Sequence, residues 1–352
     1  MKKKSFPTKL VFNIFVICLC VGIVCFFFFS EDGLRDLLQS GQGIIWQWIV
    51  VAVISQLVYM FTETTVIYLF IRERYKNFSY LNALKVSFTG LFWSAVTPSS
   101  TGGQPMQIYL LHSMNVEIGY ATSRLMQKFL VYQVVLTLIS IISVILNFGY
   151  ILTNDNIVFM IILLVFGFVS QLAVTLVIVM FSFSPNISRK FIMFFAKVLG
   201  KIKIVKNLDS KISDIDKQLD TFHSSNKNIY KKPKLLISAV ILTFVQFIAM
   251  FLVPYFIYLS FGLTDIGPVQ IATSQAFVNL MSGMIPIPGA SGAAELGYTA
   301  FFGAIFVGGT LKSSALIWRV INYYGVIFAT APFAYLTKDK TDQAKKETKN
   351  KN

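Results

Sequence analysis

A run of polar and conformationally special residues, "TPSSTGGQPMQ" (residues 97–107), interrupts a strongly apolar part of the chain. Proline removes a backbone donor and glycine lets the chain turn, so helical hydrogen bonding cannot run through this segment unbroken. The freed backbone groups, with nearby hydroxyl and amide side chains, can bind a polar ligand, and the next helix adds partial positive charge that suits a phosphate or carboxylate. The alternative is a hairpin whose small residues only let helices pack closely. The candidate ligand-binding residues here are Ser99, Ser100, Thr101, Gly102, Gly103, Gln104 and Gln107.

A second interruption, "IPIPGASGAAE" (residues 285–295), has a similar character. Aligning Pro98 with Pro286 places Gln107 on Glu295 and overlaps the small residues of the two motifs. Glu295 opens the following helix, where it is either a helix cap or a ligand contact. Two breaks in matching positions favour a substrate site over simple packing. Pro288, Gly289 and Glu295 are the candidate residues of this second break.

Ionisable residues inside apolar windows are costly and are therefore functional candidates. Glu63 lies in the middle of one apolar window, and Arg319 lies in the last one. Arg319 either binds an anionic headgroup through its forked donors, forms a buried pair with Glu63 or Glu295, or extends its charge toward the interface. Arg124 and Lys128, one helical turn apart, either follow the positive-inside rule or bind lipid phosphates at an entrance.

The composition shows which elements must position these residues. The chain has 352 residues, of which 55% are hydrophobic and 13% charged, and its mean hydropathy is +0.66. Because a soluble domain of this size cannot cover so much apolar surface, the sequence predicts an all-α polytopic membrane protein. About six spans are expected, with two re-entrant or broken helix hairpins between them. The predicted spans are 10–29, 44–70, 124–147, 157–181, 234–261 and 313–336, and the predicted hairpins are 81–114 and 268–309.

The placement of charge predicts the topology. The net charge is +15, and lysine is concentrated at the N-terminus, in the amphipathic segment 185–234 and in the tail 338–352. Basic segments stay in the cytoplasm, so both termini are expected there, and each broken hairpin must enter and leave on one side. Residues 1–337 are thus predicted to form a single membrane domain. The first span is read as an uncleaved anchor, with a signal peptide as the alternative.

The two hairpins lie in segments with the same outline. Residues 44–147 and residues 234–336 each read as a span, a broken hairpin and a span, with the hairpins entered from opposite sides. Opposite-facing repeats with broken helices near the midplane are a known plan of transporters. The sequence therefore predicts an inverted repeat.

The motifs "TPSSTGGQPMQIYLL", "SRLMQK" and "PIPGASGAAELGY" resemble the lysylphosphatidylglycerol synthase transmembrane, or flippase-like, family over roughly residues 10–336. The resemblance implies lipid handling. In the best-known relatives the membrane unit is fused to a soluble aminoacyl-transferase domain, and the unit is held to flip the lysyl-lipid outward. That soluble domain is not expected here. Some relatives carry an arginine near the position of Gln107, which this chain lacks.

The leading hypothesis is a translocator of anionic or aminoacylated phospholipid, such as lysyl-phosphatidylglycerol, in a bacterial plasma membrane. A phosphatidylglycerol lysyltransferase, or an accessory to one, is the enzymatic alternative, and a proton-coupled small-solute transporter that uses Glu63 or Glu295 is a third. Phospholipids with anionic headgroups are the expected partners, while no nucleic acid, cofactor, metal or catalytic residue is expected. The sequence leaves the oligomeric state open.

Overall fold

A computed structural model describes residues 43–147, 149, 157–201, 208–229, 231–282, 288–290, 292–307 and 309–334. This part of the chain consists of helices and connecting turns, without strands. The predicted first span 10–29 and the basic tail 338–352 lie outside the described residues.

Long apolar helices form the body of the molecule. The helices α3 (Trp46–Arg72), α6 (Ile118–Leu146), α8 (Ile157–Phe183) and α11 (Pro233–Ser260) each include a stretch that is long and apolar enough to cross a bilayer. They lie where the sequence predicts spans, and the all-α polytopic membrane architecture is confirmed. The last predicted window, 313–336, overlaps α14 (Thr310–Arg319) and includes a π-helical turn η3 (Val320–Tyr324), and the helix continues to residue 334.

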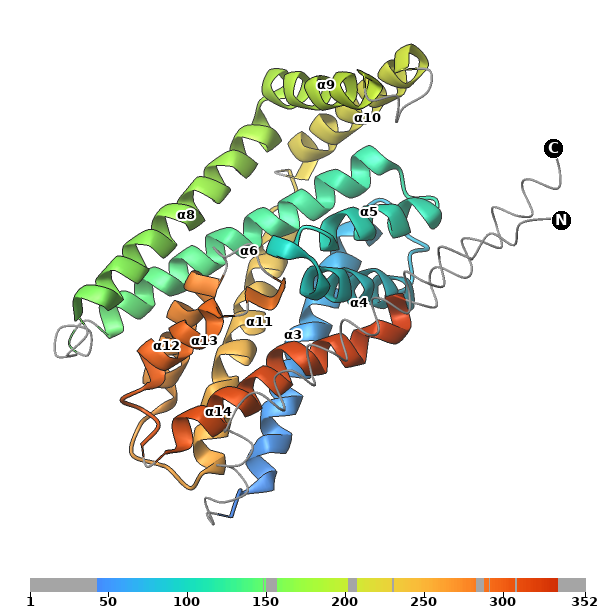
Figure 1. The fold of residues 1–352 in the computed structure, drawn as a ribbon. Coiled ribbons are helices and arrows are strands. Elements are labelled where there is room, and N and C mark those ends of the chain that lie inside the picture. Colours follow the sequence, from blue (N-terminus) through green and yellow to red (C-terminus); the bar gives the residue numbers. More distant parts are fainter. Residues whose placement is uncertain are drawn as a thin grey trace, which may run out of the picture.

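Helices α3 and α11 pack side by side along the centre of the molecule (Figure 1). They run antiparallel, because the backbone N–H of Ile45 at the start of α3 donates to the carbonyl of Ser260 at the end of α11, 2.9 Å away. At the opposite end, Lys232 before α11 pairs with Glu73 after α3. The central pair thus has both of its ends fastened by polar contacts.

Both predicted hairpins are broken helices. The first consists of α4 (Tyr80–Val96), the short 3₁₀ turn η1 (Pro98–Ser100) and α5 (Gly103–Ser113). The second consists of α12 (Pro268–Ser282), the 3₁₀ turn η2 (Pro288–Ala290) and α13 (Ala293–Phe302). In the first hairpin α5 packs tightly on α4, since a Cβ atom added to Gly103 would lie 2.0 Å from the hydroxyl oxygen of Ser94.

The structure shifts the sequence alignment of the two breaks by two residues. Each 3₁₀ turn begins at a proline, Pro98 or Pro288, and each following helix begins five residues later. Pro98 therefore corresponds to Pro288 and not to Pro286, and Glu295 corresponds to Pro105 and not to Gln107. In this register "PSSTGG" lies on "PGASGA", which is a closer match than the alignment on Pro286 gives.

The predicted amphipathic segment 185–234 forms two helices, α9 (Pro185–Lys201) and α10 (Leu208–Ile229), which lie across one end of the bundle (Figure 1). They follow α8, of whose apolar stretch only 17% is buried, against 33–39% for the other three long helices. Of these four long helices, α8 is therefore the one with the most exposed apolar surface.

Candidate functional site

The two helix breaks meet. Turns η1 and η2 pack against each other with Cα atoms within 8 Å, although 190 residues separate them in sequence. We call this contact the break junction (Pro98–Ser100 with Pro288–Ala290). The backbone of both turns enters the left-handed region: φ is +49° at Ser99, +54° at Ser100, +63° at Gly289 and +49° at Ala290. Non-glycine residues rarely take such values, and strain of this kind gathers at functional sites.

Tyr323 of the π-helical turn ties the break junction together. Its hydroxyl donates to the carbonyl oxygen of Ala95, 3.1 Å away, near the end of α4. Its ring lies directly over Gly289, since a Cβ atom there would come within 2.4 Å of the ring. Only glycine fits at this position, both because of its φ and because of this close approach. One side chain therefore holds the two breaks together.

Arg319, one helical turn before Tyr323, points its guanidinium at the second break. Its Nε donates to Glu295 at 2.6 Å, and its Nη1 donates to the carbonyl oxygen of Gly289 at 2.9 Å. The residue is 5% exposed, and its guanidinium also lies near the rings of Trp318 and Tyr323. Its Nη2 is buried and has no hydrogen-bond partner in the described part of the chain. Such a group can donate hydrogen bonds to an anionic oxygen without breaking the existing bonds.

Glu295 fills both structural roles that the sequence leaves open. One carboxylate oxygen accepts from Arg319, and the other accepts from the backbone N–H of Gly292 at 2.6 Å, which caps α13. The carboxylate thus fixes the position of the arginine and the start of the helix together. Its negative charge also balances the guanidinium, so the pair of the buried arginine and the half-buried glutamate is neutral.

The hydroxyl residues of the first break are accessible. Ser99, Ser100 and Thr101 are exposed, and Gln104 is half-buried. Gly102 is anchored, since its N–H donates to the hydroxyl of Thr97 at 2.9 Å. The junction is therefore exposed at η1, while the guanidinium of Arg319 is buried against η2, and the donors of both parts have the chemistry that suits a phosphate or carboxylate. Gln107 is not part of this exposed surface, because it is buried against Gly90 between α4 and α5.

Glu63 lies in a second polar group between α3, α6 and α11. It forms an ion pair with Lys128, and its other oxygen accepts from the amide of Gln246 at 3.1 Å. Both charged side chains are largely buried. The sequence left Glu63 as a partner for Arg319, but the structure pairs it with Lys128 instead. The reason is that Lys128 is on α6, which packs directly on α3.

Arg124 belongs to a third group at the α9–α10 end of the bundle. It donates to Glu73 at 2.6 Å and to the amide oxygen of Gln127 at 2.9 Å, and it is 2% exposed. Burial acts to raise the pKa of Glu73, but hydrogen bonds from Lys232 and Tyr120 and the charge of Arg124 outweigh it and lower that pKa below its usual value. Arg124 and Lys128 are thus held in structural ion pairs away from the break junction.

Sequence reasoning missed Tyr323 and Glu73. The available signal for Tyr323 was its spacing, since residues four apart share one face of a helix and Arg319 had already been singled out. Glu73 lies among basic residues that were used only to predict the membrane topology. No group of three or more His, Cys, Asp or Glu side chains that could hold a metal ion occurs within the described residues.

The long apolar helices and the paired broken hairpins define a multi-pass, all-α membrane protein. Residues 11–329 match the model of the lysylphosphatidylglycerol synthase TM region, and the chain belongs to this family. It is also similar to a UPF0104 membrane protein of Archaeoglobus fulgidus, with 23% identity over 257 residues that cover 71% of this chain and 74% of the relative. No solved structure gives a significant match.

Proposed function

We propose that the protein is a lipid translocator that moves an anionic or aminoacylated phospholipid, such as lysyl-phosphatidylglycerol, between leaflets. The observation that carries this proposal is the break junction, where two strained, non-helical turns meet. Arg319 is bonded to one of these turns at Gly289, and its Nη2 has no partner in the described part of the chain. Non-helical backbone at membrane depth is tolerated where protein buries it or where it lines a wet cavity. In the proposed route a phosphate enters at the exposed Ser99 and Ser100 and moves on to this donor.

The order of the helices supports a rocking mechanism. We infer that α3 to α6 and α11 to η3 are inverted repeats, because the central helices α3 and α11 run antiparallel and the two breaks meet between the halves. Transporters of this plan expose a fixed central site alternately to the two sides of the membrane. The proposal places the protein in a bacterial plasma membrane, with both termini and the α9–α10 end in the cytoplasm.

The decisive experiment reconstitutes the purified chain in vesicles that contain short-chain, fluorescently labelled phosphatidylglycerol or lysyl-phosphatidylglycerol. Exchange between leaflets is followed by chemical quenching of the outer-leaflet probe. We expect faster exchange than in protein-free vesicles. No acceleration for either probe would overturn the proposal.

Substitution of Arg319 links the assay to the site. We expect Arg319→Lys to keep the charge opposite Glu295 but to lose the forked donors, and to slow exchange about tenfold, the effect of one lost charge-assisted hydrogen bond of about 1.5 kcal/mol. Arg72→Gln, which changes an exposed arginine at the end of α3, is the matched control and should leave the rate unchanged. Equal exchange rates for the two variants would show that Arg319 does not contribute to lipid exchange.

Proton-coupled transport of a small solute is the second candidate, favoured by the buried carboxylate of Glu63. It predicts uptake that is driven by a pH gradient and lost in Glu63→Gln. Lipid exchange without any solute uptake would support the lipid translocator and exclude this second candidate.

A further inference from the structure

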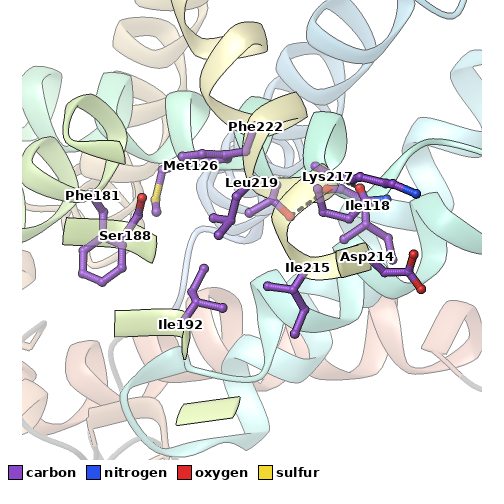
Figure 2. Close-up of a pocket in the computed structure, with 13 residues that line it drawn as sticks. Ile118, Met126, Phe181, Ser188, Ile192, Asp214, Ile215, Lys217, Leu219 and Phe222 are labelled. Atoms are coloured by element: carbon purple, nitrogen blue, oxygen red, sulfur yellow. Dashed lines mark hydrogen bonds between the residues drawn. The ribbon is translucent and has the colours of Figure 1, made fainter. Parts of the chain in front are cut away.

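A pocket lies apart from the break junction, between the start of α6, the end of α8 and the helices α9 and α10 (Figure 2). Its volume is about 560 Å³, which is within the range of small-ligand sites, roughly 300–1,000 Å³. No residue that lines it belongs to the break junction. Its wall is mainly apolar and includes Met126, Phe181, Ile192, Ile215, Leu219 and Phe222.

The pocket is built into the packing of α10 on α6. The amide oxygen of Gln218 accepts from the backbone N–H of Gly119 at 2.7 Å, and Asn226 accepts from the hydroxyl of Ser123 at 2.6 Å. A Cβ atom at Gly119 would come within 2.3 Å of the carbonyl oxygen of Gln218, so the two helices are in close contact there. Polar contacts therefore hold α10 on one side, while Leu219 and Phe222 face the open space (Figure 2).

The helices around the pocket are those that lipid would meet. Large apolar side chains are exposed on the last turns of α8, as at Val177 and Met180, and on α9, as at Phe191 and Phe194. Helix α9 also carries exposed Arg189 and Lys190. Exposed apolar and basic residues on one short helix are typical of a helix that lies in the membrane interface. The pocket is thus at the depth where headgroups give way to acyl chains.

One end of the pocket carries two opposite charges. Asp214 and Lys217, one helical turn apart on α10, are exposed and lie together at that end in Figure 2. Neither forms an ion pair with the described part of the chain, unlike Asp216, which pairs with Arg189. An unpaired ammonium suits a phosphate, and an unpaired carboxylate suits an amine. A headgroup that carries both groups would complement this rim.

We infer that the pocket binds an amine-bearing phospholipid of the surrounding leaflet, with one acyl chain among the apolar side chains, the phosphate at Lys217 and the amine at Asp214. This site goes beyond the proposed translocation, since it lies at the edge of the bundle and not between the two breaks.

The test uses the full chain in phosphatidylcholine vesicles that contain a phosphatidylethanolamine probe with a photoreactive group on one acyl chain. After illumination, the labelled peptides are mapped by mass spectrometry. We expect labelling to be enriched at α10 and the start of α6. Leu219→Trp and Met126→Trp, which fill the pocket, should each lower that labelling at least fivefold. Val165→Trp, on the exposed face of α8, is the control and should leave it unchanged.

The headgroup is tested with a phosphatidylglycerol probe of the same chain length, which lacks the amine. We expect it to label the pocket several-fold less than phosphatidylethanolamine, and Asp214→Asn to remove the difference. Equal labelling by the two probes, or unchanged labelling in both tryptophan variants with normal gel filtration, would overturn the inference. Because the readout is position and not lipid exchange, failure of the translocation assay would leave this result intact.

Discussion

At the scale of the residue, the proposed binding chemistry of the break junction depends on Arg319. A guanidinium has five N–H donors. Here Nε is committed to Glu295, and Nη1 reaches Gly289, so the site has a fixed arginine with one free edge at Nη2. An anion that binds there need not displace Glu295, so the ion pair can persist while the anion is bound. The arginine is thus a fixed element of the site, with its position set before any ligand arrives.

Breaking the Arg319–Glu295 pair should be costly. Glu295→Gln would leave the guanidinium buried without a counter-charge, which typically costs about 3–5 kcal/mol. We expect the free energy of unfolding in detergent to fall by that amount. Glu117→Gln is the matched control, since Glu117 pairs with Arg74 at the surface, where such pairs contribute about 0–1 kcal/mol. Equal losses for the two variants would contradict the structural role of the buried pair.

At the scale of the element, the shape of the breaks depends on backbone conformations that side chains oppose. Gly289 has a positive φ and lies under the ring of Tyr323, whereas Gly262 has a positive φ of +72° and open space around it. Gly289→Ala should therefore cost the left-handed strain of about 1–2 kcal/mol plus an overpacking term of about 1–3 kcal/mol. Gly262→Ala should cost only the first. Thermal unfolding of the two variants checks this order. An equal loss of stability would show that the ring of Tyr323 moves aside without cost.

The sequence predicted the breaks because proline and clustered glycine leave a plain signal. The long helices α3 and α11 were predicted because a run of about 20 apolar residues is an equally plain signal. The register between the breaks was wrong by two residues, since either Pro286 or Pro288 could be aligned with Pro98, and the starts of the 3₁₀ turns and of the following helices select Pro288. The pairing of Glu63 with Lys128 could not be predicted either, because it depends on which helices pack together.

Helix α10 should respond to pH through His223. Its Nε2 lies 2.7 Å from the hydroxyl of Ser188 on α9, and burial lowers its pKa below the usual 6.5, although the backbone of Ser182 and the charge of Asp220 act in the other direction. The unfolded form therefore takes up protons at a higher pH than the folded form. The free energy of unfolding is therefore at its full value, as far as His223 is concerned, above pH 6.5. It declines as the pH falls toward the lower pKa of the folded state.

The expected result is faster amide hydrogen exchange in α10 at pH 5.5 than at pH 7.5, after correction for the intrinsic rate. His223→Gln should remove this difference. A pH response that persists in the variant would assign it to another group.

At the scale of the whole molecule, three contacts join the half from α3 to α6 to the half from α11 to η3. The Lys232–Glu73 pair fastens one end of the central helices, the Ile45–Ser260 hydrogen bond fastens the other, and the break junction lies beside them. Each contact joins one half to the other. A relative movement of the halves must therefore exchange these contacts or pivot about them, and the ends of α3 and α11 give fixed points by which to follow it.

The antiparallel central pair makes a definite prediction about sidedness. Asn77 and Lys231, both exposed and close to the Glu73–Lys232 pair, should lie on one side of the membrane, and exposed Asp265 on the other. The chain is first freed of its three native cysteines, and then Asn77→Cys, Lys231→Cys or Asp265→Cys is introduced. Since basic segments remain in the cytoplasm, a membrane-impermeant thiol reagent added outside intact cells should label only the cysteine at position 265. Labelling of position 77 but not 231 would contradict the antiparallel arrangement, whereas labelling of both without position 265 would keep the fold and reverse its orientation.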